Sequence, residues 1–261
     1  MVNKNVVAGL GEIGGPILQI ISKACPAVGF DINKKSMDMK KFERYQNLKT
    51  SFLHICIPFT KDLITNVISL YNKFQPEAIV IHSTISPGTT SKLQSRLSIP
   101  IIYSATRGVH KRMLYDLRRY TKFYAVDPNV PRADWAASSY EKLLKKCGVK
   151  PKRMSTPITL ELAKILVDTS YYGWLITYAQ LSNMIAVEHK VDYDEMWSFA
   201  DEIHKFLGNR PKMFPGIIGG HCVIPNLDLV QNQTLGFIKK LNDMYTKKVK
   251  NAKSIAKKYQ K

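Results

Sequence analysis

Short apolar runs alternate with stretches of helical periodicity along the first half of the chain. Strand-like apolar runs lie at 5–9, 27–33, 52–59, 78–85, 99–106 and 122–128. Between them, apolar residues recur at helical spacing in segments such as 16–23, 61–73 and 89–97. This alternation predicts an α/β fold with a doubly wound parallel sheet.

The pattern changes after residue 156, where strand-like runs stop. Apolar residues then follow helical spacing over residues 159–190, which predicts one long helix with a kink near Gly173, and 193–207 predicts another. We therefore expect two domains, an α/β domain over 1–156 and an all-α domain built on the long helix over 157–261. The apolar face of that helix should pack on the first domain, on other helices or on a second subunit, and we expect a homodimer through this half.

Composition narrows the class of protein. No window of the 261 residues approaches the roughly 18 uninterrupted apolar positions of a membrane-spanning helix, and the N-terminus lacks the sections of a signal peptide. We expect a cytoplasmic protein without a membrane partner. The four cysteines lie far apart with no C-x-x-C spacing, so we expect no metal site and no disulfide framework.

The formal net charge of +19 favours an anionic partner without choosing its kind. No nucleic-acid recognition motif and no interleaved basic and aromatic stripe is recognisable in the sequence. We therefore expect a small-molecule substrate, anionic or sugar-like, and no nucleic acid.

Three glycines follow the first strand-like run in the spacing G-x-G-x-x-G. Such glycines permit a tight turn, close approach of the backbone to a pyrophosphate and close packing of helix on strand, as in Rossmann-type domains. The second strand-like run ends in Asp31, where a carboxylate would accept hydrogen bonds from an adenosine ribose. The predicted NAD-binding residues here are Gly9, Leu10, Gly11, Glu12, Ile13, Gly14 and Asp31. Lys34 and Lys35 leave NADP as an alternative.

Ligands of doubly wound sheets bind at the carboxyl ends of the strands. That rule adds further candidates for cofactor or substrate contact: Ile57, Pro58, Phe59, Thr60, Ser83 and Thr84. A hydroxyl that merely caps a loop is an equally good interpretation of Ser83.

A glycine-flanked cysteine stands out in the second half. In FPGIIGGHCVIPN, residues 214–226, Gly219 and Gly220 come before His221 and Cys222, which suggests a loop that approaches a ligand closely and presents a thiol. The alternative is a small buried hydrophobe, the commoner state of a free cysteine.

Five segments together resemble the nucleotide-sugar dehydrogenases, the UDP-glucose, UDP-N-acetylmannosamine and GDP-mannose enzymes. GLGEIGGPI resembles their G-L-G-Y-V-G-L-P-L opening, ICIPFT their I-C-V-P-T-P, and HSTISPGTT their S-T-V-P-P-G-T-T. ELAK resembles their E-x-x-K helix, and PGIIGGHCVIP their P-G-x-G-x-G-G-H-C-I-P loop. The segments occur in the family's order and span nearly the whole chain.

The resemblance implies a two-step oxidation of a primary alcohol with NAD. By it, Cys222 matches the nucleophile that captures the aldehyde and forms a thioester, and Lys164 matches the active-site lysine, which would stabilise thiolate and oxyanion charge. Thr84 matches the threonine of the S-T-x-P-P-G turn. Asp168 and Asn226 stand where the family has asparagine and aspartate. A solvated helix lysine is the alternative for Lys164.

The chain departs from the family in two further ways. Thr106 follows the strand-like run where the family has a glutamate, and a threonine needs an activating group to act as a base at neutral pH. The chain also ends about forty residues after Cys222, so we expect a form without the family's C-terminal UDP-binding domain.

These departures leave two alternatives to the two-step oxidation. One is a single-step hydroxyacid dehydrogenase resembling the 6-phosphogluconate and 3-hydroxyisobutyrate group, in which Lys164 is the acid/base and Cys222 is dispensable. The other is a protein that binds NAD without catalysis.

Overall fold

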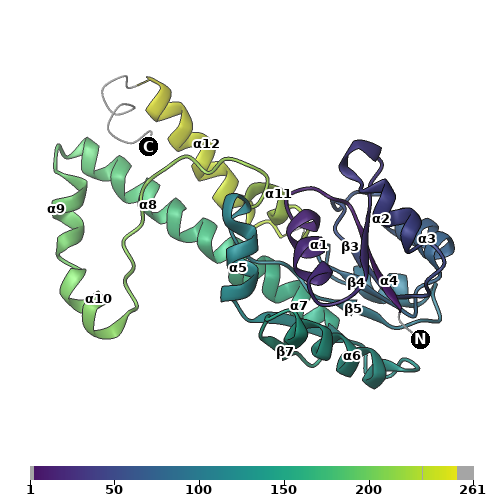
Figure 1. Ribbon diagram of the computed structural model, residues 1–261. Coiled ribbons are helices and arrows are strands. Elements are labelled where there is room, and N and C mark those ends of the chain that lie inside the picture. Colours follow the sequence, from purple (N-terminus) through teal and green to yellow (C-terminus); the bar gives the residue numbers. More distant parts are fainter. Residues whose placement is uncertain (1–2, 231, 252–261) are drawn as a thin grey trace. The chain divides into compact units, whose positions relative to one another are not determined.

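A computed structural model describes residues 3–230 and 232–251 (Figure 1). The chain divides into two compact units, Met1–Lys164 and Ile165–Lys261. Among the described residues, none of the helices has both the length and the apolar character needed to cross a bilayer.

A seven-stranded sheet in the order β2-β1-β3-β4-β5-β6-β7 forms the centre of the first unit. Its strands are β1 Lys4–Ala8, β2 Ala27–Phe30, β3 Thr50–Ile55, β4 Ala78–Ile81, β5 Ile101–Tyr103, β6 Lys122–Val126 and β7 Pro151–Arg153. Neighbouring strands are parallel except β5 and β6. The doubly wound α/β fold is thus confirmed, with two differences: β6 runs antiparallel, and β7 was not predicted.

Helices cover both faces of this sheet. They are α1 Gly14–Ser22, α2 Met39–Arg44, α3 Leu63–Phe74, α4 Thr89–Gln94, α5 Met113–Arg119, α6 Ala133–Lys146 and α7 Pro157–Leu162, with short 3-10 turns at Lys34–Ser36 and His110–Arg112. Val7 of β1 packs in one apolar cluster with residues of α1, α5 and α6, whereas Val6 packs in the opposite cluster with residues of α3 and α4. Burial on both faces explains why the strands are nearly continuous apolar runs.

In the described residues of the second unit, all the regular secondary structure is helical. A π-helical segment, Ala163–Ser170, spans the boundary between the units and is followed by α8 Tyr171–Glu188, α9 Tyr193–Ser198, α10 Asp201–Leu207, α11 Ile224–Leu227 and α12 Gly236–Asn251. The long helix predicted over 159–190 is interrupted by irregular turns at 163–170, and Gly173, where a kink was predicted, lies three residues after them in regular α8. A Cβ on Gly173 would lie 2.9 Å from Cγ1 of Val223, so this glycine serves close packing.

The buried stripe of α8 is partly polar, which the apolar pattern did not predict. Thr177, Gln180 and Asn183 are each at most 2 % exposed. The side-chain nitrogen of Gln180 donates to the Gly216 carbonyl at 2.7 Å and to Oδ1 of Asn242, on α12, at 3.0 Å. Part of the apolar surface of α8 consequently faces outward.

Candidate functional site

The turn after β1 requires its glycines for three different reasons. Gly9 has a φ of +87°, and a Cβ there would lie 2.9 Å from the Cys56 carbonyl oxygen. A Cβ on Gly14 would lie 1.7 Å from the Gly9 carbonyl oxygen, so only glycine lets α1 begin there. A Cβ on Gly11 would meet nothing within 4 Å, which leaves open space beside this backbone. The turn therefore fits a pyrophosphate, which needs an unobstructed approach to the start of a helix.

The other residues of the turn hold its shape. The Leu10 amide donates to Oδ2 of Asp31 at 2.7 Å. Oε2 of Glu12 lies 2.7 Å from Nδ1 of His110, and Ile13 is half-buried against the apolar cluster under α1. The first turn of α1 has no side-chain cap from Ile13, the residue at its N-cap.

Asp31 fastens the end of β2 to the glycine turn. Its Oδ1 accepts from the Asn33 amide at 2.8 Å, in addition to the bond between Oδ2 and Leu10. Because each carboxylate oxygen can accept two hydrogen bonds, Asp31 keeps acceptor capacity for a ribose hydroxyl. Its carboxylate thus has a structural role that the sequence did not reveal, and this role is compatible with the predicted one.

The loops after β3 and β4 are joined by Ser83. Its hydroxyl donates to the Ile57 carbonyl at 2.5 Å, which is the loop-capping interaction considered for it. Ile57, Phe59 and Thr84 are half-buried, and Pro58 is exposed. These residues stand at the carboxyl ends of β3 and β4, next to the strand pair β1–β3 where the sheet order reverses.

Glu161 is a buried acid that the sequence analysis overlooked. It is 1 % exposed, and its carboxylate accepts from the Gly88 amide at 2.6 Å and from the Thr90 amide and hydroxyl at 3.0 and 2.5 Å. It thereby joins α7, which leads to Lys164, to the turn that follows Thr84. Its position three residues before Lys164 in ELAK was the available signal.

Lys122 is a second overlooked residue, placed at the carboxyl edge of the sheet because β6 runs antiparallel to β5. It is 5 % exposed, and its ammonium donates to the carbonyls of Ser104 and Ala105 at 2.8 and 3.0 Å and to Oγ1 of Thr106 at 2.9 Å. Burial lowers the pKa of Lys122 to about 7. The only sequence signal was a lysine at the start of an apolar strand.

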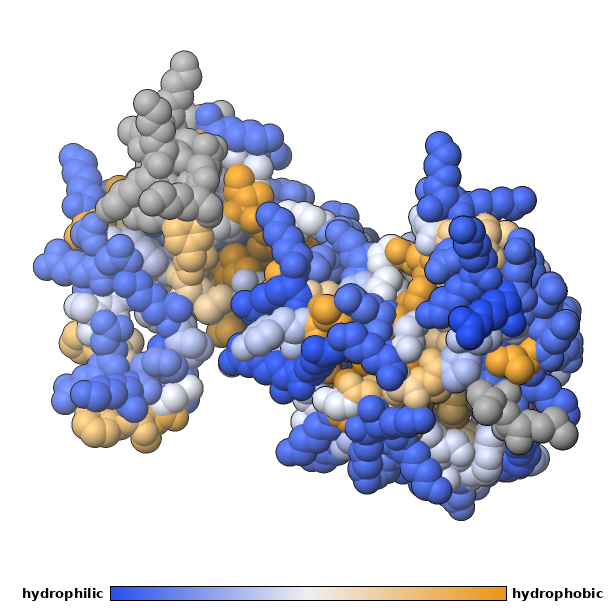
Figure 2. Space-filling model, in the orientation of Figure 1, coloured by the Kyte–Doolittle hydropathy of each residue, from blue (hydrophilic) through white to orange (hydrophobic). Residues whose placement is uncertain are grey.

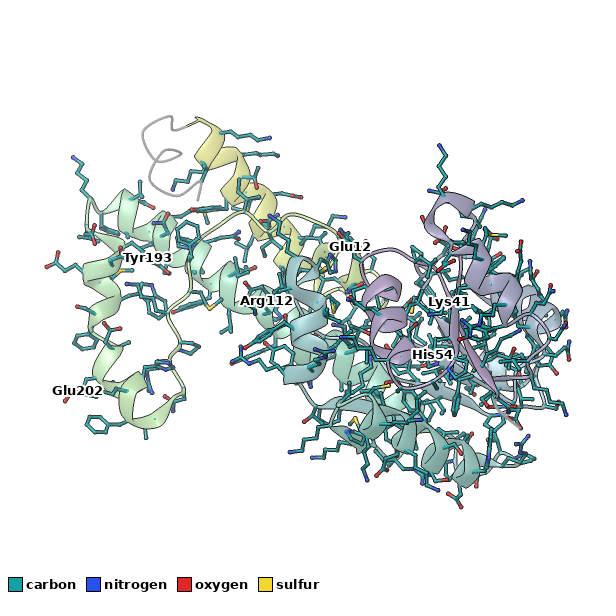
Figure 3. The ribbon with its side chains drawn as sticks, in the orientation of Figure 1. Glu12, Lys41, His54, Arg112, Tyr193 and Glu202 are labelled. Atoms are coloured by element: carbon teal, nitrogen blue, oxygen red, sulfur yellow. The ribbon has the colours of Figure 1, made fainter. Side chains whose placement is uncertain are left out.

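Two buried histidines lie beside Lys122 on β3 and just after β4. Nδ1 of His54 is 3.0 Å from Nε2 of His82, and Nε2 of His54 is 3.3 Å from Oδ1 of Asn5 (His54 is labelled in Figure 3). Burial, with a smaller contribution from the charge of Lys122, lowers the pKa of His54 to about 3 and also lowers that of His82. Both rings are therefore neutral at neutral pH.

In the second unit, an extended segment leads from α10 to the cysteine loop. Two side chains hold it: Gln180 donates to Gly216, and Asn242 both accepts from the Ile218 amide at 2.8 Å and donates to the Ile218 carbonyl at 3.2 Å. Tyr193 of α9 donates to the Met213 carbonyl at 2.8 Å and fixes the start of the segment (Figure 3). These amide side chains also escaped the sequence analysis.

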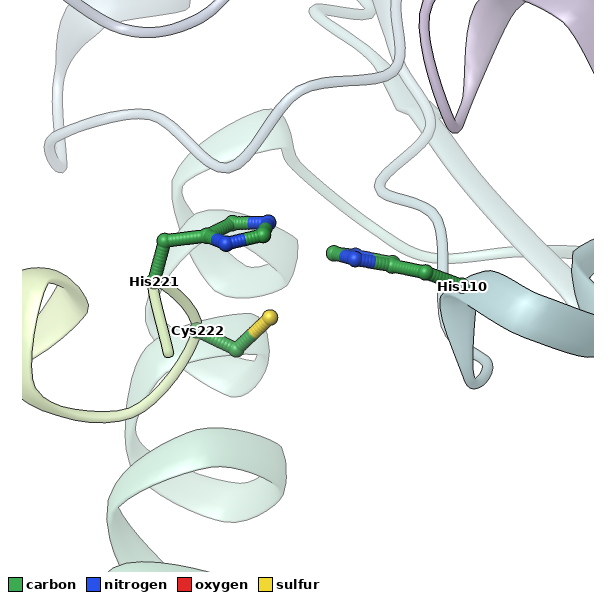
Figure 4. Close-up of side chains that lie close together, drawn as sticks. All are labelled: His110, His221 and Cys222. Carbon is green, nitrogen blue, oxygen red and sulfur yellow. The ribbon is translucent and has the colours of Figure 1, made fainter. Parts of the chain in front are cut away.

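The cysteine loop follows directly and precedes α11. Gly220 has a φ of +71°, a backbone conformation that glycine adopts without strain, and His221 and Cys222 come after it (Figure 4). Cys222 is exposed, whereas the other three cysteines are partly buried. Cys222 is therefore not a small buried hydrophobic residue, which was the alternative considered for it.

The predicted residues divide between the two units. The first unit carries the glycine turn with Asp31, the strand-end residues with Thr84, and Lys164, which is half-buried at the start of the π-helical segment. The second unit carries Asp168, which is exposed in the π-helical segment, together with Cys222 and the half-buried Asn226 of α11.

Comparison with solved structures relates this architecture to known proteins. UDP-D-ManNAc dehydrogenase from Pyrococcus horikoshii has a TM-score of 0.76 and 18% identity over 95% of this chain and 70% of its own. UDP-N-acetyl-mannosamine dehydrogenase from Staphylococcus aureus has a TM-score of 0.73 and 18% identity over 98% and 71%. The chain has the fold of the nucleotide-sugar dehydrogenases. The resemblance expected from the five motifs is thus confirmed at the level of fold.

A shorter neighbour shares the fold as well. The 3-hydroxyisobutyrate dehydrogenase of Mycobacterium tuberculosis has a TM-score of 0.65 and 14% identity over 95% of this chain and 94% of its own. No protein-family model and no curated protein sequence matches the chain. These structural similarities establish one thing: the chain has the fold that the nucleotide-sugar dehydrogenases share with 3-hydroxyisobutyrate dehydrogenase.

Proposed function

We propose that this protein is an NAD-dependent dehydrogenase that oxidises a primary alcohol of a sugar or nucleotide sugar. The observation that carries the proposal is the exposed thiol of Cys222 on a glycine-flanked loop, in a chain whose other unit contains a dinucleotide-type turn. The order of motifs in the sequence and the shared fold support the same reaction class.

The first unit would bind the cofactor. Gly9, Gly11 and Gly14 shape a turn that a pyrophosphate can approach, and Asp31 offers acceptor capacity to a ribose. A carboxylate there disfavours the 2′-phosphate of NADP through charge repulsion, so NAD is the proposed dinucleotide. Bound NAD would accept hydride from the alcohol carbon.

The second unit would supply the nucleophile. The Cys222 thiolate would add to the carbonyl carbon of the aldehyde and form a thiohemiacetal. A second molecule of NAD would take the hydride from that carbon and leave a thioester, whose sulfur–carbon bond water would cleave to release the acid and the thiol. Lys164 would stabilise negative charge on the substrate oxygen, and Thr84, Asp168 and Asn226 would orient substrate and water.

A single-step hydroxyacid dehydrogenase is the second candidate. It is favoured by the 3-hydroxyisobutyrate dehydrogenase neighbour, of which the chain covers 94%. In that reaction Lys164 would exchange the substrate proton, and Cys222 would take no part.

The deciding experiment is the alkylation rate of Cys222 as a function of pH, with and without NAD, followed by mass spectrometry. The other cysteines are internal controls, because burial raises the pKa of Cys56 to about 12, that of Cys147 to about 11, and that of Cys25 as well. We expect Cys222 to react fastest, at a pH well below about 8.5, and to change its rate when NAD binds.

A slow Cys222 that is indifferent to NAD would instead favour the single-step candidate. Cys222→Ser then separates the two reactions. The substitution should abolish acid formation from UDP-glucose or GDP-mannose in the first case, and should leave oxidation of 3-hydroxyisobutyrate within a few-fold in the second.

A further inference from the structure

The ammonium of Lys122 has three acceptors, and they are not equivalent. The carbonyl oxygens of Ser104 and Ala105 can only accept hydrogen bonds. Oγ1 of Thr106, at 2.9 Å, belongs to a hydroxyl that can accept or donate. Three donated hydrogen bonds account for all three protons of a charged lysine.

Loss of one proton from Lys122 therefore has a defined consequence. A neutral amine keeps two N–H groups, which the two carbonyls hold, and its lone pair can face only the Thr106 hydroxyl. The third hydrogen bond must then reverse, with Thr106 donating to Nζ. Its Oγ1 is thereby free to accept a proton from another molecule, and no hydrogen bond from the Thr106 hydroxyl to another group is seen in the described part of the chain.

We propose that Thr106 and Lys122 form a proton relay that takes the proton of the substrate alcohol. The proposal rests on the dehydrogenase function proposed above. As hydride leaves the alcohol carbon for the nicotinamide, the hydroxyl proton passes to Oγ1 of Thr106 and the proton of Thr106 passes to Nζ of Lys122. The products are an aldehyde, reduced dinucleotide and a lysine ammonium, which later returns its proton to solvent.

The position of the pair suits this role. Thr106 follows β5 and Lys122 begins β6, so both stand at the carboxyl edge of the sheet, where ligands of this fold bind. Thr106 was singled out in the sequence as a residue in need of an activating group, and the buried amine is such a group. Lys122 would act through Thr106 as a positioning and proton-holding residue.

The surroundings of Lys122 keep its pKa close to neutral pH, so that both the amine and the ammonium are populated. Burial is the main cause that lowers its pKa to about 7, and the cations Lys164 and Arg107 lower the pKa further. The Cys56 thiol, whose pKa burial raises to about 12, carries no charge in this range of pH. His54 and His82 also face it but are neutral, since burial lowers the pKa of each. A base with a pKa close to the working pH is the most effective one in general base catalysis.

The first test needs no substrate. NMR of protein labelled with ¹³C-lysine should show one side chain that titrates near pH 7, and its signal should be absent from Lys122→Arg. In Thr106→Val the pKa of Lys122 should fall, because the ammonium loses an acceptor, whereas Thr106→Ser should retain the wild-type pKa. If Lys122 titrates like an exposed lysine, or if its pKa is the same in Thr106→Val as in wild type, the reversible hydrogen bond does not exist.

The second test uses NAD with UDP-glucose and GDP-mannose as probes, since the relay rests on the first of the two reactions proposed above. For the probe that is oxidised, kcat should rise with pH through the pKa of Lys122 in wild type and in Thr106→Ser. Thr106→Val should lower kcat by about 100-fold with little change in KM and should lose this rise. A Thr106→Val enzyme with the wild-type pH profile would overturn the relay. Absence of turnover in wild type would instead overturn the dehydrogenase proposal, while the NMR titration still decides whether the hydrogen bond reverses.

Discussion

At the scale of single residues, buried or half-buried polar side chains fix several of the loops that carry candidate site residues. Asp31 fixes the glycine turn, Glu161 fixes the turn after Thr84, and Gln180 fixes the segment before Cys222. In each case the side chain satisfies backbone groups that would otherwise be costly to bury. Positions in such loops are therefore defined by residues outside the recognised motifs.

The Glu161 carboxylate offers a quantitative test of this arrangement. The Glu161 carboxylate accepts hydrogen bonds from Gly88 and Thr90, which act only as donors here. In Glu161→Gln one carboxylate oxygen becomes an NH₂ group that faces these donors and cannot accept from them. The substitution also removes the negative charge that strengthens the remaining hydrogen bonds. We expect the free energy of unfolding to fall by about 2–3 kcal/mol in denaturant titrations. Glu43→Gln, at an exposed position of α2, is the matched control and should change it by less than about 0.5 kcal/mol. An equal effect of the two substitutions would contradict the role of Glu161.

At the scale of elements, two substitutions in the glycine turn distinguish the residues needed for folding from those needed for dinucleotide binding. Gly14→Ala places a methyl group against the Gly9 carbonyl, whereas Gly11→Ala places it in open space. We expect Gly14→Ala to destabilise the first unit by several kcal/mol, and Gly11→Ala to change stability by less than about 1 kcal/mol.

Dinucleotide affinity provides the complementary measurement for the glycine turn. Gly11→Ala should weaken NAD binding at least tenfold in calorimetric titrations although the protein remains folded, because its methyl group occupies the approach to the backbone. Unchanged affinity in a folded Gly11→Ala protein would show that no pyrophosphate passes this position.

Elements with local determinants could be predicted from the sequence. The turn at Gly9, Gly11 and Gly14 was predictable because its steric requirements act over a few residues, and β1 and β3 because burial on both faces makes a continuous apolar run. The direction of β6 was not, since the same apolar run serves a parallel or an antiparallel neighbour. The short β7, Pro151–Arg153, is half-buried to exposed and so lacks the apolar signal.

The candidate site residues likewise differ in whether neighbouring residues in the sequence determine their environment. The exposure of the Cys222 thiol was predictable from its glycine neighbours. Lys122 was not, because its role depends on the carbonyls of Ser104 and Ala105, which the sheet brings to it from across the β5–β6 pair. The π-helical segment likewise has no signature in the apolar periodicity, and the helix prediction placed the irregularity at the nearest glycine.

At the scale of the whole molecule, positive charge is divided unevenly between the units. Residues 1–164 contain 26 Lys and Arg against 11 Asp and Glu, whereas residues 165–261 contain 13 against 9. The summed positive charge of the first unit favours an anionic ligand such as a dinucleotide. The second unit is distinguished instead by apolar side chains in solvent, among them Phe206 and Leu207 at the end of α10. Figure 2, coloured by hydropathy, shows apolar areas on the surface of this unit.

We expect the homodimer contact predicted from the sequence to lie on the outward surface of α8. Tyr171, Tyr178 and Ile185 recur every seven residues and are 57%, 61% and 47% exposed, so they form an apolar stripe along one side of the helix. Such a stripe is typical of a helix that packs against a partner, and an identical stripe on a second copy is complementary by two-fold symmetry.

Ile185→Glu tests the stripe, because a buried carboxylate without a partner is strongly unfavourable. We expect wild type at micromolar concentration to have the mass of a dimer in light scattering, and Ile185→Glu to have that of a monomer. Phe206→Glu is the matched control, since it introduces the same charge at an exposed apolar position of α10 outside the stripe, and it should remain dimeric. A monomeric wild type would refute the dimer. A third outcome is a dimer that persists in Ile185→Glu and dissociates in Phe206→Glu. It would show that the second copy covers α10 and not the stripe of α8, because a charge disrupts the apolar surface that is covered.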